Sequence, residues 1–297
     1  MASTPATFLF SAVTGYFVQD DIDTDWTNAT TTLPGLGLID REYETDQDFD
    51  PQREKTQWQR FTHFIDHLNK RDAGKAMYKL IYATRHGQGY HNAKETEVGT
   101  AAWEAHWAPL DGDGVTSWFD SLLTPTGQGQ ARDLNTFWRN SSSELKLPLP
   151  QSHYASPLTR CMETQQLSFK DLTLPSGDPA PSNPVIKELL RELMGIHSCD
   201  RRRTRSYIQE KFSDAVIEEG FTEEDELWKP DVRETRPEHA VRVSKVLGQL
   251  FQHDPATVVA WTAHCGTIIA LYMAIGHKVV CVLPGSVVPV LVKAEII

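Results

Sequence analysis

The sequence predicts an α/β fold: a three-layer α/β/α sandwich with a mostly parallel central sheet. Short apolar runs that are typical of buried parallel strands occur at three places, and each run stops abruptly at polar residues. Segments with helical spacing of apolar residues alternate with these runs. This order favours a parallel sheet with helices on both faces. The length of 297 residues allows one large α/β domain or two small ones.

The first 75 residues are predicted to form an N-terminal extension that packs on a core domain at 76–297. An apolar stretch at Phe8–Val18 is interpreted as a buried strand or anchor. It is too short to cross a bilayer and no basic residue precedes it, so we predict neither a membrane span nor a signal peptide. An amphipathic helix is expected over Thr56–Asn69, because apolar residues recur there at helical spacing: Trp58, Phe61, Phe64, Ile65 and Leu68.

The core domain is expected to begin with a buried strand over Tyr78–Thr84. Residues 93–124 are rich in Trp, Gly and Asp, and we interpret them as a cap insertion over the end of that strand. A helix is predicted over residues 124–139, because its first residue, a threonine, is a suitable N-cap and a proline follows in the first turn.

The rest of the core alternates between strands and helices. In chain order we predict a strand at 153–155, a helix opened by Ser156-Pro157, a proline-rich loop at 174–184, a helix at 234–251, a strand at 257–263, a helix at 267–275, and closing strands around 279–283 and 287–292.

The charge balance excludes some classes of partner. Forty acidic side chains against 29 basic ones give a formal net charge of −11, which argues against a nucleic-acid-binding protein because phosphate backbones require a basic face. In such an acidic chain, an anion site must be built from concentrated local positive charge. The four scattered cysteines do not form a disulfide framework, so a reducing, cytoplasmic setting is predicted.

Chemically useful side chains follow the three predicted strands. Arg85 and His86 come after the first strand, Arg160 lies shortly after the second, and His264 follows the third. Ligands bind beyond the carboxyl ends of parallel strands, so we expect these residues to meet at one rim. Guanidinium groups match the oxygens of a phosphate, and an imidazole nitrogen can attack its phosphorus. Gly87 is expected to let the backbone approach the ligand closely.

Five ordered segments carry a family resemblance. They resemble the signatures of the histidine phosphatase superfamily, also called phosphoglycerate mutase-like, over about residues 78–295: Thr84–Asn92, Leu123–Ala131, Ser156–Arg160, Leu190–Gly195 and Ala263–Thr267. Residues 85–92 and 197–202, together with the N-terminal extension, are most similar to fungal phosphomutase-like proteins.

The resemblance implies a role for each matching residue. His86 would be the nucleophile, and its other ring nitrogen should donate to a backbone carbonyl that fixes the tautomer. Glu192 would protonate the leaving oxygen and then activate water. The phosphoryl oxygens would be bound by Arg85, Arg160 and His264, with an additional hydrogen bond from Asn92. Neither a metal nor a cofactor is expected.

Three assignments stay open at this level. Glu188 and Glu163 are alternative proton donors. The cluster of Arg201, Arg202, Arg203 and Arg205 either recognises a second anionic group of the substrate or forms a solvated face paired with glutamates. His197 and Cys199 have spacing compatible with a metal clip, but no second pair lies at a matching distance, so a zinc site is not predicted.

The predicted function is hydrolysis of a small-molecule phosphate ester through a phosphohistidine on His86, with no nucleic-acid or membrane partner. A phosphomutase is the alternative, although Gln88 stands where many mutases have glutamate. Cys265, at a position where glycine is frequent, is expected to narrow the pocket. A third hypothesis is a catalytically silent protein that only binds phosphate. The presence of a proton donor argues against it, because binding alone does not need one.

Overall fold

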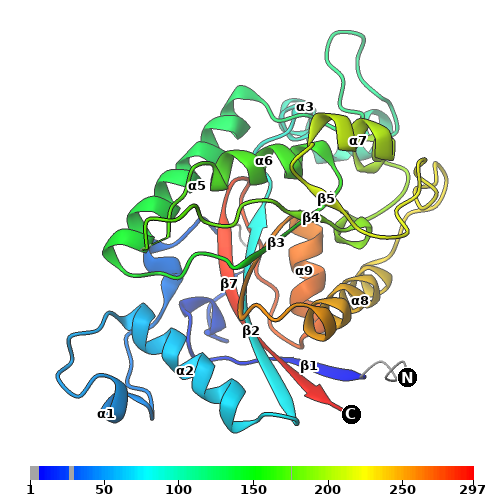
Figure 1. Ribbon diagram of the computed structural model, residues 1–297. Coiled ribbons are helices and arrows are strands. Elements are labelled where there is room, and N and C mark those ends of the chain that lie inside the picture. Colours follow the sequence, from blue (N-terminus) through cyan, green and yellow to red (C-terminus); the bar gives the residue numbers. More distant parts are fainter. Residues whose placement is uncertain (1–6, 27–29, 175) are drawn as a thin grey trace.

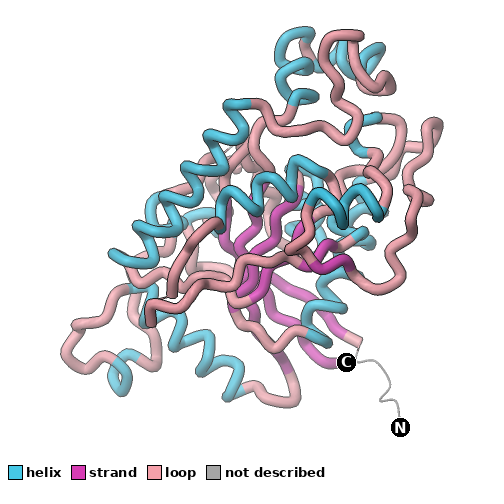
Figure 2. Tube along the Cα trace, turned by 45° about the horizontal axis from the view of Figure 1, so that its top comes forward, coloured by secondary structure: helices cyan, strands magenta, loops and turns pink. Residues whose placement is uncertain are grey.

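A computed structural model describes residues 7–26, 30–174 and 176–297. Within these residues seven strands form one sheet in the order β1-β7-β2-β6-β3-β4-β5, with helices on both of its faces (Figures 1 and 2). The strands are β1 (Phe8–Ala12), β2 (Ala76–Arg85), β3 (Ser152–Ala155), β4 (Val185–Ile186), β5 (Val216–Ile217), β6 (Val258–Ala263) and β7 (Val287–Ile296).

The sheet is mixed. Strands β2, β6, β3, β4 and β5 run parallel to one another, whereas β7 is antiparallel to β2 and β1 is antiparallel to β7. The predicted three-layer α/β architecture is therefore confirmed, and its parallel part contains the three strands singled out from the sequence. β7 does not pair with β6, the strand before it in the chain: 23 residues that include α9 connect the two, and β7 lies on the other side of β2.

The helices are α1 (Asp46–Phe49), α2 (Gln57–Arg71), α3 (Tyr90–Val98), α4 (Thr100–Ala102), α5 (Pro125–Glu144), α6 (Thr159–Phe169), α7 (Arg205–Lys211), α8 (Arg236–His253) and α9 (Cys265–Ala274). Successive side chains of β2 point to opposite faces of the sheet. Leu80 and Tyr82 pack into a core with α2 and α5, and Ile81 and Ala83 pack into a second core with α8 and α9. A strand that is buried on both faces is apolar throughout, as the sequence indicated.

The N-terminal extension joins the same sheet. β1 is its edge strand, and α2 packs against β2 over the core that contains Trp58, Phe61 and Ile65. The helix predicted at Thr56–Asn69 is confirmed as α2: the Thr56 side chain caps it by accepting a hydrogen bond from the Gln59 N–H.

One predicted strand is wrong. Residues 279–283 run extended but join no ladder, and Val282 makes only an isolated bridge with Thr30. The backbone of Cys281 is hydrogen-bonded to Trp26 and Thr30 of the N-terminal extension instead of to the sheet. The two-residue strands β4 and β5 and the short helix α7 were not predicted, because elements of this length contain too few residues to show a period.

The cap insertion lies beyond the end of β2 (Figure 1). It contains α3, α4 and a short π-helical turn at Trp103–Trp107, and its buried Trp103 and Trp118 pack together with Cys199. A search of the described residues finds no helix that combines the length and the hydropathy needed to cross a membrane.

Candidate active site

The parallel register brings the three strand ends together. Arg85, the last residue of β2, lies opposite Ala263 of β6, and Ala155 of β3 lies opposite Thr262. The residues that follow therefore meet at one edge of the sheet. The rings of His86 and His264 lie edge to face, with 5.1 Å between their centroids.

His86 is held in one tautomer. Its Nδ1 lies 2.7 Å from the carbonyl oxygen of Gly87, which only accepts hydrogen bonds, so Nδ1 carries the proton. The other nitrogen, Nε2, is consequently unprotonated, and its lone pair accepts a hydrogen bond from the Nε–H of Arg160 over 3.2 Å. Burial, followed by the charges of Arg160 and Arg85, holds the pKa of His86 well below its ordinary value of 6.5. The imidazole is therefore neutral and suited to nucleophilic attack.

Arg160 lies in the first turn of α6 and is 1% exposed. Besides His86, its guanidinium contacts the carbonyl oxygen of Cys199 at 2.6 Å and Oδ1 of Asp200 at 3.0 Å. The helix start is fixed by Asp120, which accepts hydrogen bonds from both the N–H and the hydroxyl of Thr159. Buried contacts with Cys199 and Asp200 thus fix the orientation of the Arg160 guanidinium toward His86.

A cavity of about 320 Å³ opens in front of these residues. Arginines 85, 160, 233 and 236 line it together with His86 and Glu192. The Arg85 Nε–H is buried without a hydrogen-bond partner among the described residues, while its Nη1 donates to Val282. Four carboxylates, those of Glu95, Glu104, Glu192 and Asp200, line the cavity as well. Asp200 pairs with Arg160 and Arg233, whereas no ion pair of Arg85 or Arg236 is found among the described residues, so these two guanidinium groups give the cavity the local positive charge that a phosphate site requires.

Glu192 faces the same cavity and is held by backbone amides. Its Oε2 accepts from the N–H of Gly266 at 3.0 Å, and its Oε1 accepts from the N–H of Leu193 at 2.9 Å. A Cβ at position 266 would lie 2.0 Å from Oε1, so only glycine leaves room for the carboxyl group. The alternatives named from the sequence do not line the cavity: Glu188 pairs with Arg191 and Arg202, and Glu163 pairs with Lys211.

His264 and Asn92 occupy different positions around the cavity. Asn92 lines it, and its Oδ1 accepts from the N–H of Gly89 at the start of α3. His264 is fully buried, does not line the cavity, and has its Nε2 2.8 Å from the hydroxyl oxygen of Ser156. The structure thus places His264 in the wall beside His86, and its predicted contact with the phosphoryl oxygens stays a prediction.

A comparison with protein families agrees with this geometry. A family model described as histidine phosphatase superfamily (branch 1) matches residues 81–279, a range that contains all five motif segments. The chain belongs to the histidine phosphatase superfamily.

Relatives within this superfamily carry mutase names. A probable phosphoglycerate mutase of Arthroderma benhamiae is 41% identical over 286 residues, which cover 96% of this chain and 84% of the relative. A probable phosphoglycerate mutase of Saccharomyces cerevisiae is 33% identical over 255 residues, covering 77% of this chain and 83% of the relative. The crystal structure of a phosphoglycerate mutase from Thermus thermophilus covers 71% of this chain and 91% of its own, with 20% identity and a TM-score of 0.39.

Two residues predicted for the superfamily site lie elsewhere. Arg202 is 2% exposed, and its guanidinium is engaged by Glu188 and by backbone carbonyl oxygens of residues 203 and 222–224. Arg201 is exposed and stacks over Phe119 and Trp228. Neither lines the cavity. The predicted second-anion role of this cluster therefore has no geometric basis for Arg202, whose role is structural.

Two local expectations also differ from the structure. A Cβ at Gly87 would lie 2.4 Å from the carbonyl oxygen of Gly127, so this glycine serves the close approach of α5 and not that of a ligand. The side chain of Gln88 accepts from the Thr124 hydroxyl at 2.8 Å and does not line the cavity. Cys265 does line it, as expected.

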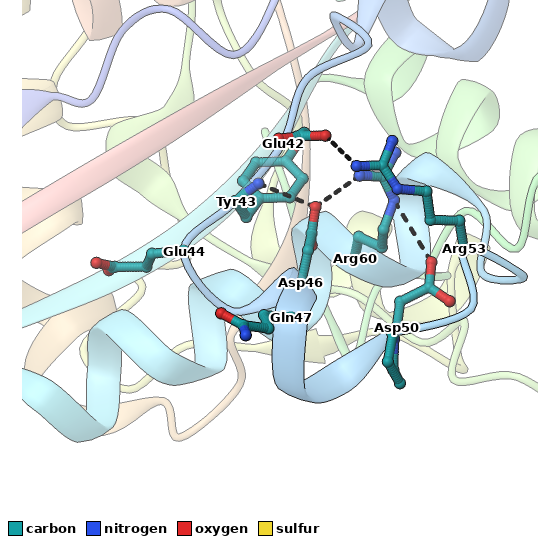
Figure 3. Close-up of a pocket in the computed structure, with 9 residues that line it drawn as sticks. Glu42, Tyr43, Glu44, Asp46, Gln47, Asp50, Arg53 and Arg60 are labelled. Atoms are coloured by element: carbon teal, nitrogen blue, oxygen red, sulfur yellow. Dashed lines mark hydrogen bonds and ion pairs between the residues drawn. The ribbon is translucent and has the colours of Figure 1, made fainter.

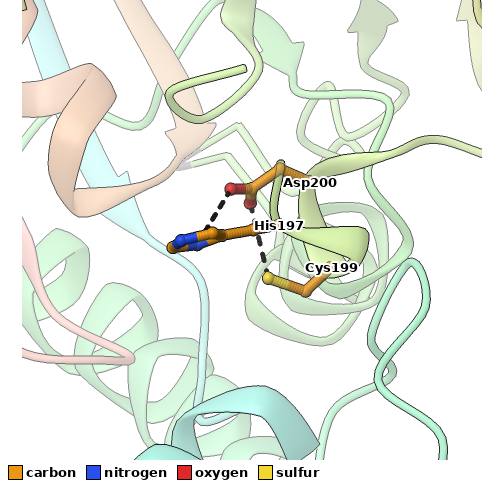
Figure 4. Close-up of side chains that lie close together, drawn as sticks. All are labelled: His197, Cys199 and Asp200. Carbon is orange, nitrogen blue, oxygen red and sulfur yellow. Dashed lines mark hydrogen bonds and ion pairs between the residues drawn. The ribbon is translucent and has the colours of Figure 1, made fainter. Parts of the chain in front are cut away.

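The cluster of His197, Cys199 and Asp200 has its potential ligand atoms within 4.8 Å of one another (Figure 4). Its chemistry does not suit a cation. Both carboxylate oxygens of Asp200 already accept hydrogen bonds from guanidinium groups, those of Arg160 and Arg233, and burial raises the pKa of the Cys199 thiol well above its ordinary value. A metal ion here would lie beside two positive charges, so we assign none.

A larger cavity of about 450 Å³ lies in the N-terminal extension (Figure 3). Four carboxylates and two arginines are among its lining residues, and the Arg60 guanidinium lies 2.7 Å from Asp46 and 3.9 Å from Asp50. No histidine is among its lining residues. It therefore lacks the nucleophile and the open positive charge of the cavity at His86.

Proposed function

We propose that this protein hydrolyses the phosphomonoester of a small molecule through a phosphohistidine on His86. The observation that carries the proposal is the bare Nε2 of His86, which faces Arg160 and the arginine-lined cavity while Nδ1–H is tied to Gly87. A protein that only binds phosphate needs no deprotonated imidazole of this kind and no carboxyl group across the cavity from it.

In the first step the Nε2 lone pair attacks the substrate phosphorus and the ester P–O bond breaks. The protonated carboxyl of Glu192 gives its proton to the leaving oxygen. Arg85 and Arg160 bind the equatorial oxygens, where charge accumulates in the transition state. In the free protein the Arg160 Nε–H donates to Nε2. When substrate binds, an oxygen of the phosphoryl group takes over this hydrogen bond while the guanidinium keeps its orientation, and the lone pair of Nε2 is released.

In the second step the Glu192 carboxylate takes a proton from water, whose oxygen attacks the phosphorus of the phosphohistidine. The P–N bond breaks, its electron pair returns to Nε2, and inorganic phosphate leaves. The hydrogen bond from Nδ1–H to Gly87 stays in place through both steps, so the ring returns to the tautomer from which it started.

A phosphomutase is the second candidate, favoured by the names of the two fungal relatives. The first step would be the same, but the phosphoryl group would pass to a hydroxyl group instead of to water. Gln88 does not separate the two reactions, because its side chain is bonded to Thr124 outside the cavity.

The test uses an aryl phosphate, with and without a chelator, and wild-type protein beside His86→Ala. We expect release of phosphate that survives chelation and disappears in the variant. His253→Ala, a substitution of an exposed histidine at the end of α8, is the control and should keep full activity. Turnover by His86→Ala would contradict the proposal. Conversion of 3-phosphoglycerate to its 2-isomer without free phosphate would replace hydrolysis by the mutase reaction.

A further inference from the structure

Asp200 is a buried carboxylate that touches the proposed catalytic machinery without touching the nucleophile. It is 2% exposed and lies at the end of a short 3-10 turn, Ser198–Asp200. Its Oδ1 accepts from Nη2 of Arg160 at 3.0 Å, and its Oδ2 accepts from Nη1 of Arg233 at 3.0 Å. One carboxylate thus connects two arginines of the same cavity.

The contacts of Arg160 leave one orientation for its guanidinium. Nη1 is bound by the carbonyl of Cys199 and Nη2 by Asp200, and both acceptors belong to the same turn. Because the guanidinium is planar and rigid, fixing both terminal nitrogens also fixes the direction of the Nε–H. That N–H then points at Nε2 of His86.

From these contacts we propose that Asp200 is a positioning residue, which aims the Arg160 guanidinium at His86 and at the phosphoryl group in transit. The inference rests on the proposed phosphohistidine chemistry. Asp200 lines the cavity but acts through the arginines that it binds, because its two oxygens are engaged by Arg160 and Arg233 and its contacts include none with His86.

Arg233 holds the carboxylate from the other side. Its Nη1 also donates to the carbonyl oxygen of Gly195, and its Nη2 lies 3.2 Å from Nδ1 of His197. His197 in turn contacts Glu104 of the cap insertion at 2.9 Å. A continuous series of polar contacts therefore joins the cap to Arg160, and Asp200 is the last residue of the series before this arginine.

Because Asp200 is negatively charged, its removal should affect turnover and phosphate affinity in different ways. The carboxylate offsets positive charge beside the phosphate site, so its removal increases the net positive charge that a bound phosphate experiences. Removal also frees Arg160 to leave its catalytic orientation. Loss of positioning should therefore lower turnover while affinity for inorganic phosphate is kept or increased, whereas a structural defect would weaken both.

The test is a double-mutant cycle with Asp200→Asn and Arg160→Lys, measuring kcat with an aryl phosphate and competitive inhibition by inorganic phosphate. We expect Asp200→Asn to lower kcat by about 10- to 100-fold, with an inhibition constant within about 3-fold of wild type or lower. In the Arg160→Lys background the same substitution should change kcat by less than about 2-fold, because the two residues act as one unit. If the losses in kcat of the two single variants multiply in the double variant, the inference is overturned.

Two additions keep the test decisive. Asp50→Asn removes another buried carboxylate, which lies beside Arg60 in the N-terminal extension, and should leave kcat unchanged. If Asp200→Asn does not fold, Arg233→Gln enters the same cycle with an expected loss of about 3- to 10-fold. This substitution releases Oδ2 of Asp200 together with the contacts of Arg233 to Gly195 and His197. Wild-type protein that forms no phosphohistidine would refute the proposed function itself, whereas multiplicative losses in an active protein refute only the role of Asp200.

Discussion

Gly266 offers a sharp test of the placement of Glu192, because the substitution Gly266→Ala adds one methyl group at a known distance. The new Cβ would lie 2.0 Å from Oε1 and 3.3 Å from Oε2 of Glu192. Cβ atoms do not approach heavy atoms closer than 3.0 Å, so the carboxyl group must retreat by about 1 Å. The end of a flexible side chain can make this movement at little cost to folding.

The catalytic cost should be large. A misplacement of about 1 Å costs up to about 100-fold in rate, and a general acid contributes about 100-fold or more. We therefore expect kcat to fall about 100-fold. Position 266 lies in the first turn of α9, where alanine is preferred to glycine by up to about 1 kcal/mol, so the melting temperature should not fall.

The assay is steady-state hydrolysis of an aryl phosphate combined with thermal unfolding. Gly129→Ala is the matched control, because it is also a helical glycine and no atom lies within 4 Å of its added Cβ. In a Glu192→Gln background, Gly266→Ala should cause no further loss, since both changes affect one carboxyl group. Normal kcat in Gly266→Ala would refute the assignment of Glu192 as proton donor.

Three further predictions concern pH and the arginine cluster. Burial lowers the pKa of His153 from 6.5 to about 4, so between these pH values the unfolded chain binds more protons and the free energy of unfolding decreases as pH falls. Between pH 7 and 5 the free energy of unfolding of His153→Phe, measured with urea, should decrease by about 2 kcal/mol less than that of the wild type. Equal decreases would contradict this prediction. The depressed pKa of His86 predicts that kcat/KM, corrected for substrate ionisation, stays level from pH 7 to 6, whereas a decline centred near 6.5 would show an ordinary imidazole. Arg202→Gln should destabilise the fold by about 3 kcal/mol and lower activity equally for substrates with one or two anionic groups; a selective loss would restore a binding role.

The sequence predicted the parallel part of the sheet and most of the residues gathered at the candidate site for the same physical reason. An apolar run that stops at a polar residue marks the carboxyl end of a buried strand, and such ends meet at one edge. His86, Arg160 and His264 therefore came together as expected. The antiparallel direction of β7 was beyond this reasoning, because a strand buried on both faces has the same apolar pattern in either direction.

Residues that act through other residues were harder to find. Asp200 and Arg233 lie in loops without periodicity, and their importance depends on which charges the fold brings beside them. Arg202 was misassigned because a run of arginines suggests a shared role. The segment is extended, so successive side chains alternate: Arg202 points inward to Glu188, while Arg201 is exposed. The alternation of side chains in an extended segment could have shown from the sequence that neighbouring arginines point to opposite sides.

The phosphorylated intermediate tests the central claim most directly. Protein quenched during turnover of a labelled phosphate ester should carry acid-labile phosphate on His86. Because Nδ1 is bound to the carbonyl of Gly87 and Nε2 faces the cavity arginine, the phosphorus should be on Nε2, which chromatography against the two phosphohistidine isomers can identify. Phosphate on Nδ1, on another residue, or absent from an enzyme that is turning over would contradict the account.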